Sequence, residues 1–272
     1  MSGITEPRGL TKGALAATSW LVYFFFYAPI LVLIIYSFSD SRNASVWGGF
    51  TTSWYSEFAS DGELTGALSN SIRIAIVATL VSVVLGTMSA FALERFRFRG
   101  QRVFDALLYL PVIIPDVTMA VMLLLFFAQA ATWFGFPKGF GTIALSHIAF
   151  CISFVSIVVR ARLSGMDDKL EEAAMDLYAS RWQAFRHVTL PLIMPGILGG
   201  GLLAMTLSLD DVVITQFVTG GGWSTLPVYV FSLIRKGVTP LINAVSVVML
   251  VASMALVALS LLAQRLRGDD AV

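Results

Sequence analysis

LAATSWLVYFFFYAPILVLIIYSF, residues 15–38, is a run of 24 residues without a single charged side chain. An α-helix rises about 1.5 Å per residue and the hydrocarbon core of a bilayer is about 30 Å thick, so about 20 apolar residues cross it. The run is too long for a signal peptide and ends without a small-residue cleavage pattern. We therefore expect a retained membrane-spanning helix.

Five further stretches are long and mainly apolar, and they lie at residues 70–93, 105–128, 141–162, 193–215 and 241–263. Over the whole chain 57% of residues are hydrophobic and only 13% are charged, about half the charged share of a globular protein. The sequence predicts an all-α polytopic membrane protein with six transmembrane helices. We expect an N-terminal segment at 1–14, one transmembrane domain at 15–263 and a tail at 264–272.

Lysine and arginine are distributed unequally between the two sides of these spans. Thirteen of the 18 fall on the side that holds both termini and five on the other. Short loops rich in Lys and Arg stay in the cytoplasm, so both termini should be cytoplasmic. The formal net charge of +1 leaves no cationic excess for binding nucleic acid.

Two of the predicted spans carry features that lipid alone would not tolerate. Pro111 and Pro115 interrupt the third, which also contains Asp116, and Asp210 and Asp211 lie in the fifth. An ionised carboxylate inside a span costs several kcal/mol unless it is paired or hydrated, so these acids should face a cavity or a protein interface. Adjacent helical residues point about 100° apart, so we expect only one of the adjacent pair to face a cavity squarely.

These three aspartates have two interpretations. They can cap broken helices or bond between subunits, which would be a structural role. Alternatively, they line a substrate path, where spaced carboxylates among aromatic rings would bind the ammonium groups of a polyamine weakly enough to release them. On this second interpretation the substrate-path residues are Asp116, Asp210 and Asp211.

The segment between the fourth and fifth spans, SGMDDKLEEAAMDLYASRWQAFRHVTLP at residues 164–191, has a strong helical pattern on the cytoplasmic side. Asp168 followed by Glu171 has the form of a capping box, and Pro191 leads into the next span. The pattern predicts a short amphipathic helix followed by a second. Such a helix can lie on lipid, but its acidic first half is unsuited to an anionic leaflet, so a protein groove is the better partner.

The same segment resembles the cytoplasmic signature of the membrane subunits of ATP-binding-cassette importers. That signature is Glu-Ala-Ala, three residues, Gly, nine residues, then an aliphatic residue, any residue, Leu and Pro. Here Glu172-Ala173-Ala174 and Val188-Thr189-Leu190-Pro191 stand at this spacing, and Tyr178 replaces the glycine. The resemblance implies an ATPase-coupling role for Glu171, Glu172, Ala173, Ala174, Leu177, Tyr178, Leu190 and Pro191.

The resemblance also implies a set of partners. The family's coupling loop docks into a cleft of a separate ATPase dimer, so ATP and Mg²⁺ would be bound there, and this chain would be neither an enzyme nor the holder of a cofactor. A second, non-identical permease subunit, an extracytoplasmic solute-binding protein and membrane lipid complete the implied assembly. The implied location is the bacterial inner membrane.

Four further runs narrow the resemblance to spermidine/putrescine permeases. These are Pro111–Asp116, Leu207–Thr215 and Ser224–Pro227, together with Ile242-Asn243-Ala244. Related permeases for ferric ion, thiamine or opines share much of the pattern and remain alternatives. A secondary transporter is a further alternative, weakened because six spans show no evident inverted halves. A membrane-embedded enzyme would need a catalytic constellation, and none is visible.

The other chemistry-bearing residues favour structural roles. Cys151 is the only cysteine, so an intrachain disulfide is excluded and packing is expected. His147 and His187 lack metal-ligand spacing and are interpreted as packing or loop residues, so no metal site is expected. Glycines from Gly196 to Gly201 form a small-residue stripe suited to close helix packing.

Overall fold

The computed structural model describes residues 9–44, 46–167, 169–237 and 239–268, with side chains described from 12 to 258 within those ranges. Among these residues, six helical stretches are long and apolar enough to cross a membrane. They are Lys12–Tyr36, Gly62–Arg95, Asp116–Phe134, Phe140–Leu163, Arg181–Asp210 and Pro240–Ala258. The prediction of an all-α protein with six transmembrane helices is confirmed.

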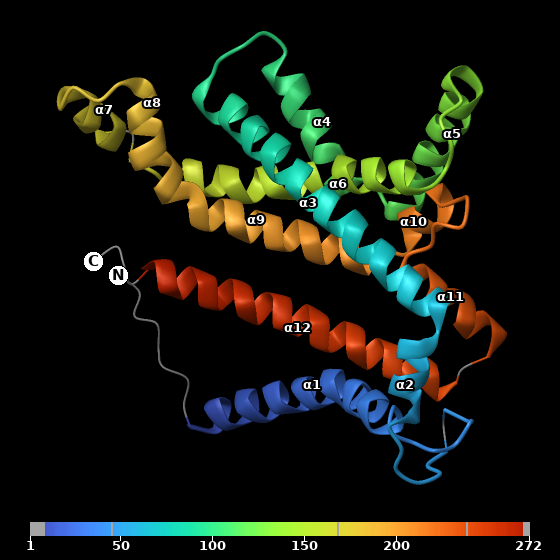
Figure 1. Ribbon diagram of the computed structural model, residues 1–272. Helices are drawn as coiled ribbons and strands as arrows, with labels where there is room; N and C mark the ends of the chain where they lie inside the picture. Colours follow the sequence, from blue (N-terminus) through green and yellow to red (C-terminus); the bar gives the residue numbers. More distant parts are fainter. Residues whose placement is uncertain (1–8, 45, 168, 238, 269–272) are drawn as a thin grey trace. The chain divides into compact units, whose positions relative to one another are not determined.

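Figure 1 shows the helices in chain order, from blue to red. Their bounds are α1 Gly9–Tyr36, α2 Ser53–Ser60, α3 Gly62–Arg95, α4 Gln101–Ile113, α5 Asp116–Phe134, α6 Phe140–Leu163, α7 Lys169–Asp176, α8 Arg181–Ala184, α9 Leu190–Asp210, α10 Val213–Val218, α11 Leu226–Lys236 and α12 Pro240–Gly268. A π-helical turn at Phe185–Thr189 joins α8 to α9. The chain divides into two compact units, one built from residues 1–61 and 233–250 and the other from 62–232 and 251–272.

In the first unit, the end of α1 is held by hydrogen bonds to the segment that follows it. The Ser37 and Tyr55 hydroxyls lie 2.8 Å apart, and the Trp54 indole N–H donates to the Ser39 carbonyl at 2.8 Å. The rings of Phe38 and Phe50 stack with centroids 5.5 Å apart. These contacts fold the polar segment after the first span back onto the helix end.

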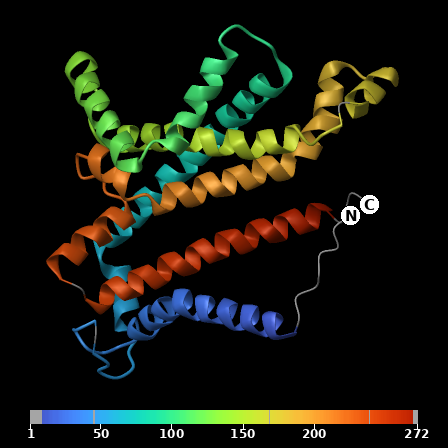
Figure 2. The same ribbon diagram turned by 180° about the vertical axis from the view of Figure 1, so that it is seen from behind.

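The second unit is built on α3, α6 and α9, which lie against one another in both views (Figures 1 and 2). Small residues allow this approach. A Cβ on Gly86 would come within 2.9 Å of the Ile152 carbonyl, and one on Gly200 within 3.3 Å of the Val155 Cα. Val155 itself is fully buried between them. The predicted packing role of the glycine stripe is confirmed at Gly200.

The third predicted span, 105–128, is wrong in its bounds. Helix α4 ends at Ile113, the chain is extended through Ile114 and Pro115, and α5 then starts at Asp116 and runs to Phe134. Proline disfavours helical geometry in the residue before it, so Pro115 ends α4 within an apolar run that hydropathy alone treats as continuous. The fifth span is likewise interrupted, because α9 ends at Asp210 and α10 begins at Val213.

Candidate functional site

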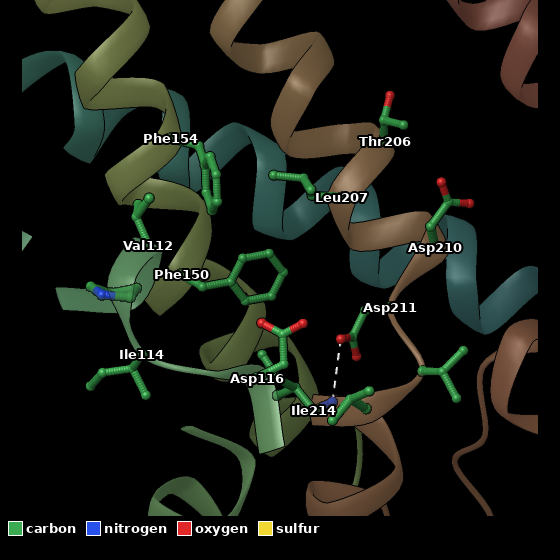
Figure 3. Close-up of a pocket in the computed structure, with 13 residues that line it drawn as sticks. Val112, Ile114, Asp116, Phe150, Phe154, Thr206, Leu207, Asp210, Asp211 and Ile214 are labelled. Atoms are coloured by element: carbon green, nitrogen blue, oxygen red, sulfur yellow. Dashed lines mark hydrogen bonds between the residues drawn. The ribbon is translucent and has the colours of Figure 1, made fainter. Parts of the chain in front are cut away.

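A pocket of about 460 Å³ lies in the second unit, where these two breaks meet α6 (Figure 3). Its walls come from the α4–α5 break, two aromatic rings of α6 and the α9–α10 break. The lining residues are Pro111, Val112, Ile114, Asp116, Phe150, Phe154, Thr206, Leu207, Asp210, Asp211, Val212, Val213 and Ile214. Three of these residues are aspartates and none is Lys, Arg or His, so the lining can bear negative charge without a fixed cation to neutralise it.

The structure brings the three predicted substrate-path residues, Asp116, Asp210 and Asp211, to this one pocket. Asp116 is the first residue of α5, where the unpaired N–H groups and the helix dipole favour a carboxylate. It is exposed within this chain. The break at Ile114–Pro115 therefore places the Asp116 side chain at a helix start beside the pocket. In an unbroken helix the same side chain would lie along the side of the helix.

Asp210 and Asp211 differ in their surroundings, but α9 ends at Asp210 and Asp211 is extended, so the expected 100° separation of helical neighbours does not apply. The Asp211 side chain is 10% exposed and accepts hydrogen bonds from the backbone N–H of Ile214 at 3.3 Å and of Thr215 at 2.7 Å. Asp210 is exposed. Figure 3 shows the two side chains pointing in different directions from the end of α9. Asp211 is thus bound to the first turn of α10, whereas Asp210 lines the pocket with an exposed side chain.

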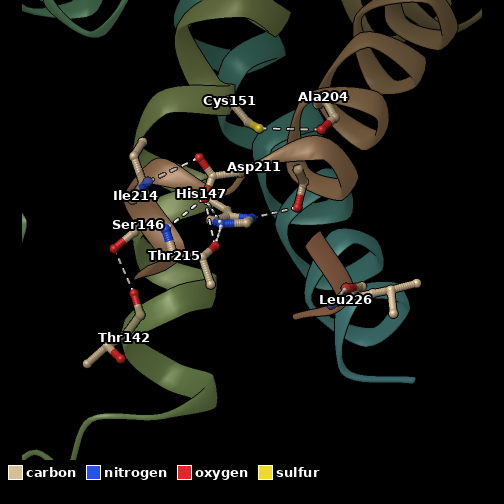
Figure 4. A network of polar contacts seen from close by, with 11 residues as sticks. Thr142, Ser146, His147, Cys151, Ala204, Asp211, Ile214, Thr215 and Leu226 are labelled. Atoms are coloured by element: carbon tan, nitrogen blue, oxygen red, sulfur yellow. Dashed lines mark hydrogen bonds and ion pairs between the residues drawn. The ribbon is translucent and has the colours of Figure 1, made fainter. Parts of the chain in front are cut away.

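Behind Asp211 lies a buried polar network that the sequence did not reveal (Figure 4). His147 of α6 is fully buried, with Nδ1 2.7 Å from the Ser208 hydroxyl and Nε2 2.9 Å from the Thr215 hydroxyl. The Thr215 hydroxyl donates to Asp211 Oδ2 at 2.7 Å. The interpretation of His147 as a packing residue was incomplete, because the ring is buried but also connects α6, α9 and α10 through polar contacts.

The predicted coupling segment forms two short helices, α7 and α8, as expected. Between them Tyr178 has φ = 64° and is the only described non-glycine residue with a positive φ. Its N–H donates to the Met175 carbonyl at 2.9 Å, and the Ala179 N–H donates to the Ala174 carbonyl at 3.1 Å. This pair of bonds is the Schellman motif, which is usually completed by glycine. The turn therefore keeps the glycine conformation with a tyrosine in place.

The coupling segment exposes large apolar side chains. Leu177 is 82% exposed, Tyr178 99% and Trp182 66%. Glu172 is exposed beside them, whereas Glu171 faces inward and binds Arg95 of α3 at 3.0 Å and the Thr189 hydroxyl. The two adjacent glutamates thus have different roles, one inside the chain and one open to a partner. The predicted cap at Asp168 lies outside the described residues.

A second arginine joins the end of α6 to the end of α3 and the start of α4. Arg160 of α6 binds Glu94 of α3 at 3.1 Å and Asp105 of α4 at 2.7 Å. This arrangement fixes the start of α4, whose other end borders the pocket at Pro111 and Val112.

The remaining predicted coupling residues are distributed over α7 and the start of α9. Ala173 is exposed and Ala174 half-buried on α7, while Leu190 and Pro191 open α9. His187 is exposed, with Nδ1 3.0 Å from the Gln183 carbonyl. Among the described residues no group of three or more His, Cys, Asp and Glu side chains has the arrangement of a metal site.

The sequence profile of the binding-protein-dependent transport system inner membrane components matches residues 82–268, which include the coupling segment, the pocket aspartates and the His147 network. The chain belongs to this family. As a family member it is a permease subunit and a multi-pass component of a membrane transport system, as the six spans and the coupling signature predicted.

Family members of known name are similar over most of their length. The putrescine transport system permease protein PotI of Escherichia coli is 46% identical over 233 residues, which cover 85% of this chain and 83% of that protein. The spermidine/putrescine transport system permease protein PotC of Haemophilus influenzae is 39% identical, covering 92% and 95% respectively. The putative 2-aminoethylphosphonate permease PhnV of Salmonella typhimurium is 30% identical, covering 86% and 87%.

The fold agrees with that of a solved permease. A chain in the crystal structure of a bacterial ABC transporter involved in the import of the acidic polysaccharide alginate superimposes with a TM-score of 0.74 at 17% identity, covering 97% of this chain and 96% of that chain. At this identity the likeness concerns the fold alone. The pocket chemistry therefore has to be judged from this chain's own side chains.

Proposed function

We propose that this permease subunit carries polyamines, such as putrescine or spermidine, or a closely related small cation from the periplasm to the cytoplasm. The observation that carries the proposal is the pocket lining, in which three aspartates stand with two phenylalanine rings and without a basic residue. Carboxylates bind ammonium groups, and aromatic faces attract cations beside an alkyl chain. The names of the relatives PotI and PotC support the same substrate class.

The pocket favours a polyamine over an aminophosphonate. A phosphonate group would be repelled by Asp116, Asp210 and Asp211 and would need Lys or Arg for binding. None of the lining residues supplies one. Ferric ion would be better served by a compact cluster of ligands, and the described residues contain no such cluster.

The proposed assembly contains an ATP-binding-cassette ATPase dimer, a second permease subunit and an extracytoplasmic solute-binding protein. ATP and Mg²⁺ would be bound by the ATPase, with Leu177, Tyr178 and Trp182 of this chain entering its cleft together with Glu172. We place the chain in the bacterial inner membrane as one transmembrane domain, residues 15–263, with the segments 1–14 and 264–272 in the cytoplasm. The Lys and Arg distribution supports this orientation.

Transport by the reconstituted complex tests the proposal. Proteoliposomes containing this chain, its ATPase and its partner permease would be supplied with the solute-binding protein and labelled putrescine, with ATP inside. Uptake should require ATP, and unlabelled spermidine should compete whereas 2-aminoethylphosphonate should not. Competition by the phosphonate alone, or ATP-driven uptake of a different solute without any polyamine uptake, would contradict the proposal.

A further inference from the structure

The His147 network occupies the junction of three helices directly behind the pocket (Figure 4). The ring comes from α6, Ser208 from α9 and Thr215 from α10, so the network joins elements separated by 61 and 68 residues in sequence. All three side chains are buried. Phe150, one turn along α6, lies 5.4 Å from the His147 ring by centroids and lines the pocket.

The hydrogen bonds around Asp211 fix which atoms of Thr215 and His147 donate and which accept. The N–H groups of Ile214 and Thr215 donate to the two carboxylate oxygens, and the Thr215 hydroxyl gives its only proton to Oδ2. The hydroxyl oxygen of Thr215 can then only accept from His147. Nε2 of His147 faces this oxygen at 2.9 Å and Asp211 Oδ2 at 3.4 Å, and both are acceptors. Nε2 must therefore carry a hydrogen.

The other ring nitrogen of His147, Nδ1, contacts Ser208. Nδ1 lies 2.7 Å from the Ser208 hydroxyl. The Ser208 hydroxyl makes no other hydrogen bond within the described residues. Ser208 is thus available to donate to Nδ1. With Nδ1 accepting in this way, the ring hydrogen lies on Nε2.

We propose that His147 is a positioning residue that holds Asp211, through Thr215, against the first turn of α10. The carboxylate of Asp211 is then engaged by the protein itself, so Asp210 and Asp116 are the two pocket carboxylates left for the ammonium groups of the substrate. This division of roles rests on the proposed function. It explains why two adjacent acids are needed, since one maintains the α9–α10 break and the other faces the solute.

A matched pair of substitutions at Thr215 tests the connection in the reconstituted complex. Thr215→Val keeps the shape but removes both the donor to Asp211 and the acceptor for His147, and ATP-driven putrescine uptake should fall about 10-fold. Thr215→Ser restores the hydroxyl and should stay near wild type. If valine and serine support equal uptake in assembled complexes, the positioning role is wrong.

Combination with Asp211→Asn distinguishes positioning from simple packing. If Thr215 acts through the Asp211 carboxylate, Thr215→Val should add little to the defect of Asp211→Asn, because the charge it positions is already absent. The same substitution should add its full effect to Asp210→Asn. Additive effects in both backgrounds would overturn the proposal. Normal uptake by Asp210→Asn itself would instead contradict the substrate role of the pocket, so the two failures are distinguishable.

The tautomer of His147 can be measured without a transport assay. The chain has two histidines, so His187→Gln leaves His147 as the only imidazole for ¹⁵N solid-state NMR of the labelled chain in its complex. The expected spectrum has one protonated nitrogen, Nε2, and one unprotonated nitrogen, Nδ1. A ring protonated on both nitrogens, or on Nδ1 alone, would overturn the donor chain. In Thr215→Val the Nε2 hydrogen loses its acceptor at 2.9 Å, so the Nε2 resonance should shift.

Discussion

The carboxylates of the coupling region and those of the pocket are stabilised in different ways. At the coupling end, Glu171 binds Arg95, and Glu94 and Asp105 share Arg160. At the pocket, Asp211 is held by uncharged donors, and none of the lining residues is arginine or lysine. Fixed cations therefore hold helix ends together in one region, whereas the pocket lining has no fixed cation to neutralise its negative charge.

The difference follows from what each region has to do. In the proposed function the ion pairs at the coupling end transmit a movement of the ATPase. A permanent partner is then useful, and partial exposure to water keeps the cost of burying the charges low. A permanent cation in the pocket would compete with the substrate. Neutral donors such as backbone N–H and hydroxyl groups stabilise a carboxylate without cancelling its charge.

The largest effect is expected at Asp210. Asp210→Asn keeps the shape but removes a charge-assisted contact, which should lower the apparent affinity of the transport step for a diamine by roughly 10- to 150-fold. Asp211→Asn should have a smaller effect on uptake, about that of Thr215→Val, because this carboxylate is engaged by the protein and not by the substrate. Uptake in vesicles measures both. Equal uptake by both variants would show that the two acids do not divide their roles.

Assembly and ATP hydrolysis are the controls for this pair. Binding of amine to the solute-binding protein should not change, since it occurs on another protein. A failure of Asp210→Asn to assemble would favour the structural interpretation, in which Asp210 bonds to a neighbouring subunit. Wild-type uptake by both variants would remove the substrate-path role altogether.

The next largest effect is expected at Glu172, the exposed glutamate of the coupling region. Glu172→Ala should reduce substrate-stimulated ATP hydrolysis and uptake by about 10-fold, since a charged hydrogen bond to the ATPase subunit would be lost. Thermal stability should be unchanged because Glu172 is exposed. The matched change Glu171→Ala should lower stability as well, because it releases Arg95. Full coupling in the Glu172 variant would exclude it from the interface.

A smaller effect is expected from Arg160, which ties α3, α6 and α4. Arg160→Gln removes two ion pairs whose side chains are about 29–35% exposed, and each should contribute up to about 1 kcal/mol. The melting temperature in detergent should fall, and more so at low salt, where screening is weaker. Arg99→Gln, an exposed residue of the neighbouring loop, is the matched control. Equal melting temperatures for both variants would mean that the ion pairs contribute nothing to stability.

The sequence predicted the features that depend on local pattern. Apolar length located the spans, the acidic amphipathic segment located α7 and α8, and the cost of buried charge singled out the three aspartates that share the pocket. His147 could not be assigned in this way. Its partners lie 61 and 68 residues away, and only the packing of α6 against α9 and α10 brings them together. Arg95 and Glu171, 76 residues apart, were likewise beyond any local signal.

The breaks were predicted only in part. Pro111 and Pro115 both suggested an interruption of the third span, but Pro111 lies within α4 and only Pro115 ends the helix. Whether a proline is tolerated inside a helix or ends it depends on where the freed carbonyls find partners. This is decided by the tertiary structure. The same applies to α9, which contains Pro195 yet ends at the two aspartates.

The smallest effect is expected at Tyr178, where the backbone of the coupling region is strained. Its φ of 64° costs a tyrosine about 1 kcal/mol more than a glycine, and its ring, 99% exposed, gains no packing within this chain. Tyr178→Gly should therefore leave transport equal or higher. Stability of the turn, followed by hydrogen exchange at Ala179, should rank Gly above Asn and Asn above Ala, the order of tolerance for this conformation. A large loss of transport in Tyr178→Gly at normal protein level, with Tyr178→Phe active, would instead show that the ring packs against the ATPase and that this exposed aromatic is retained for binding.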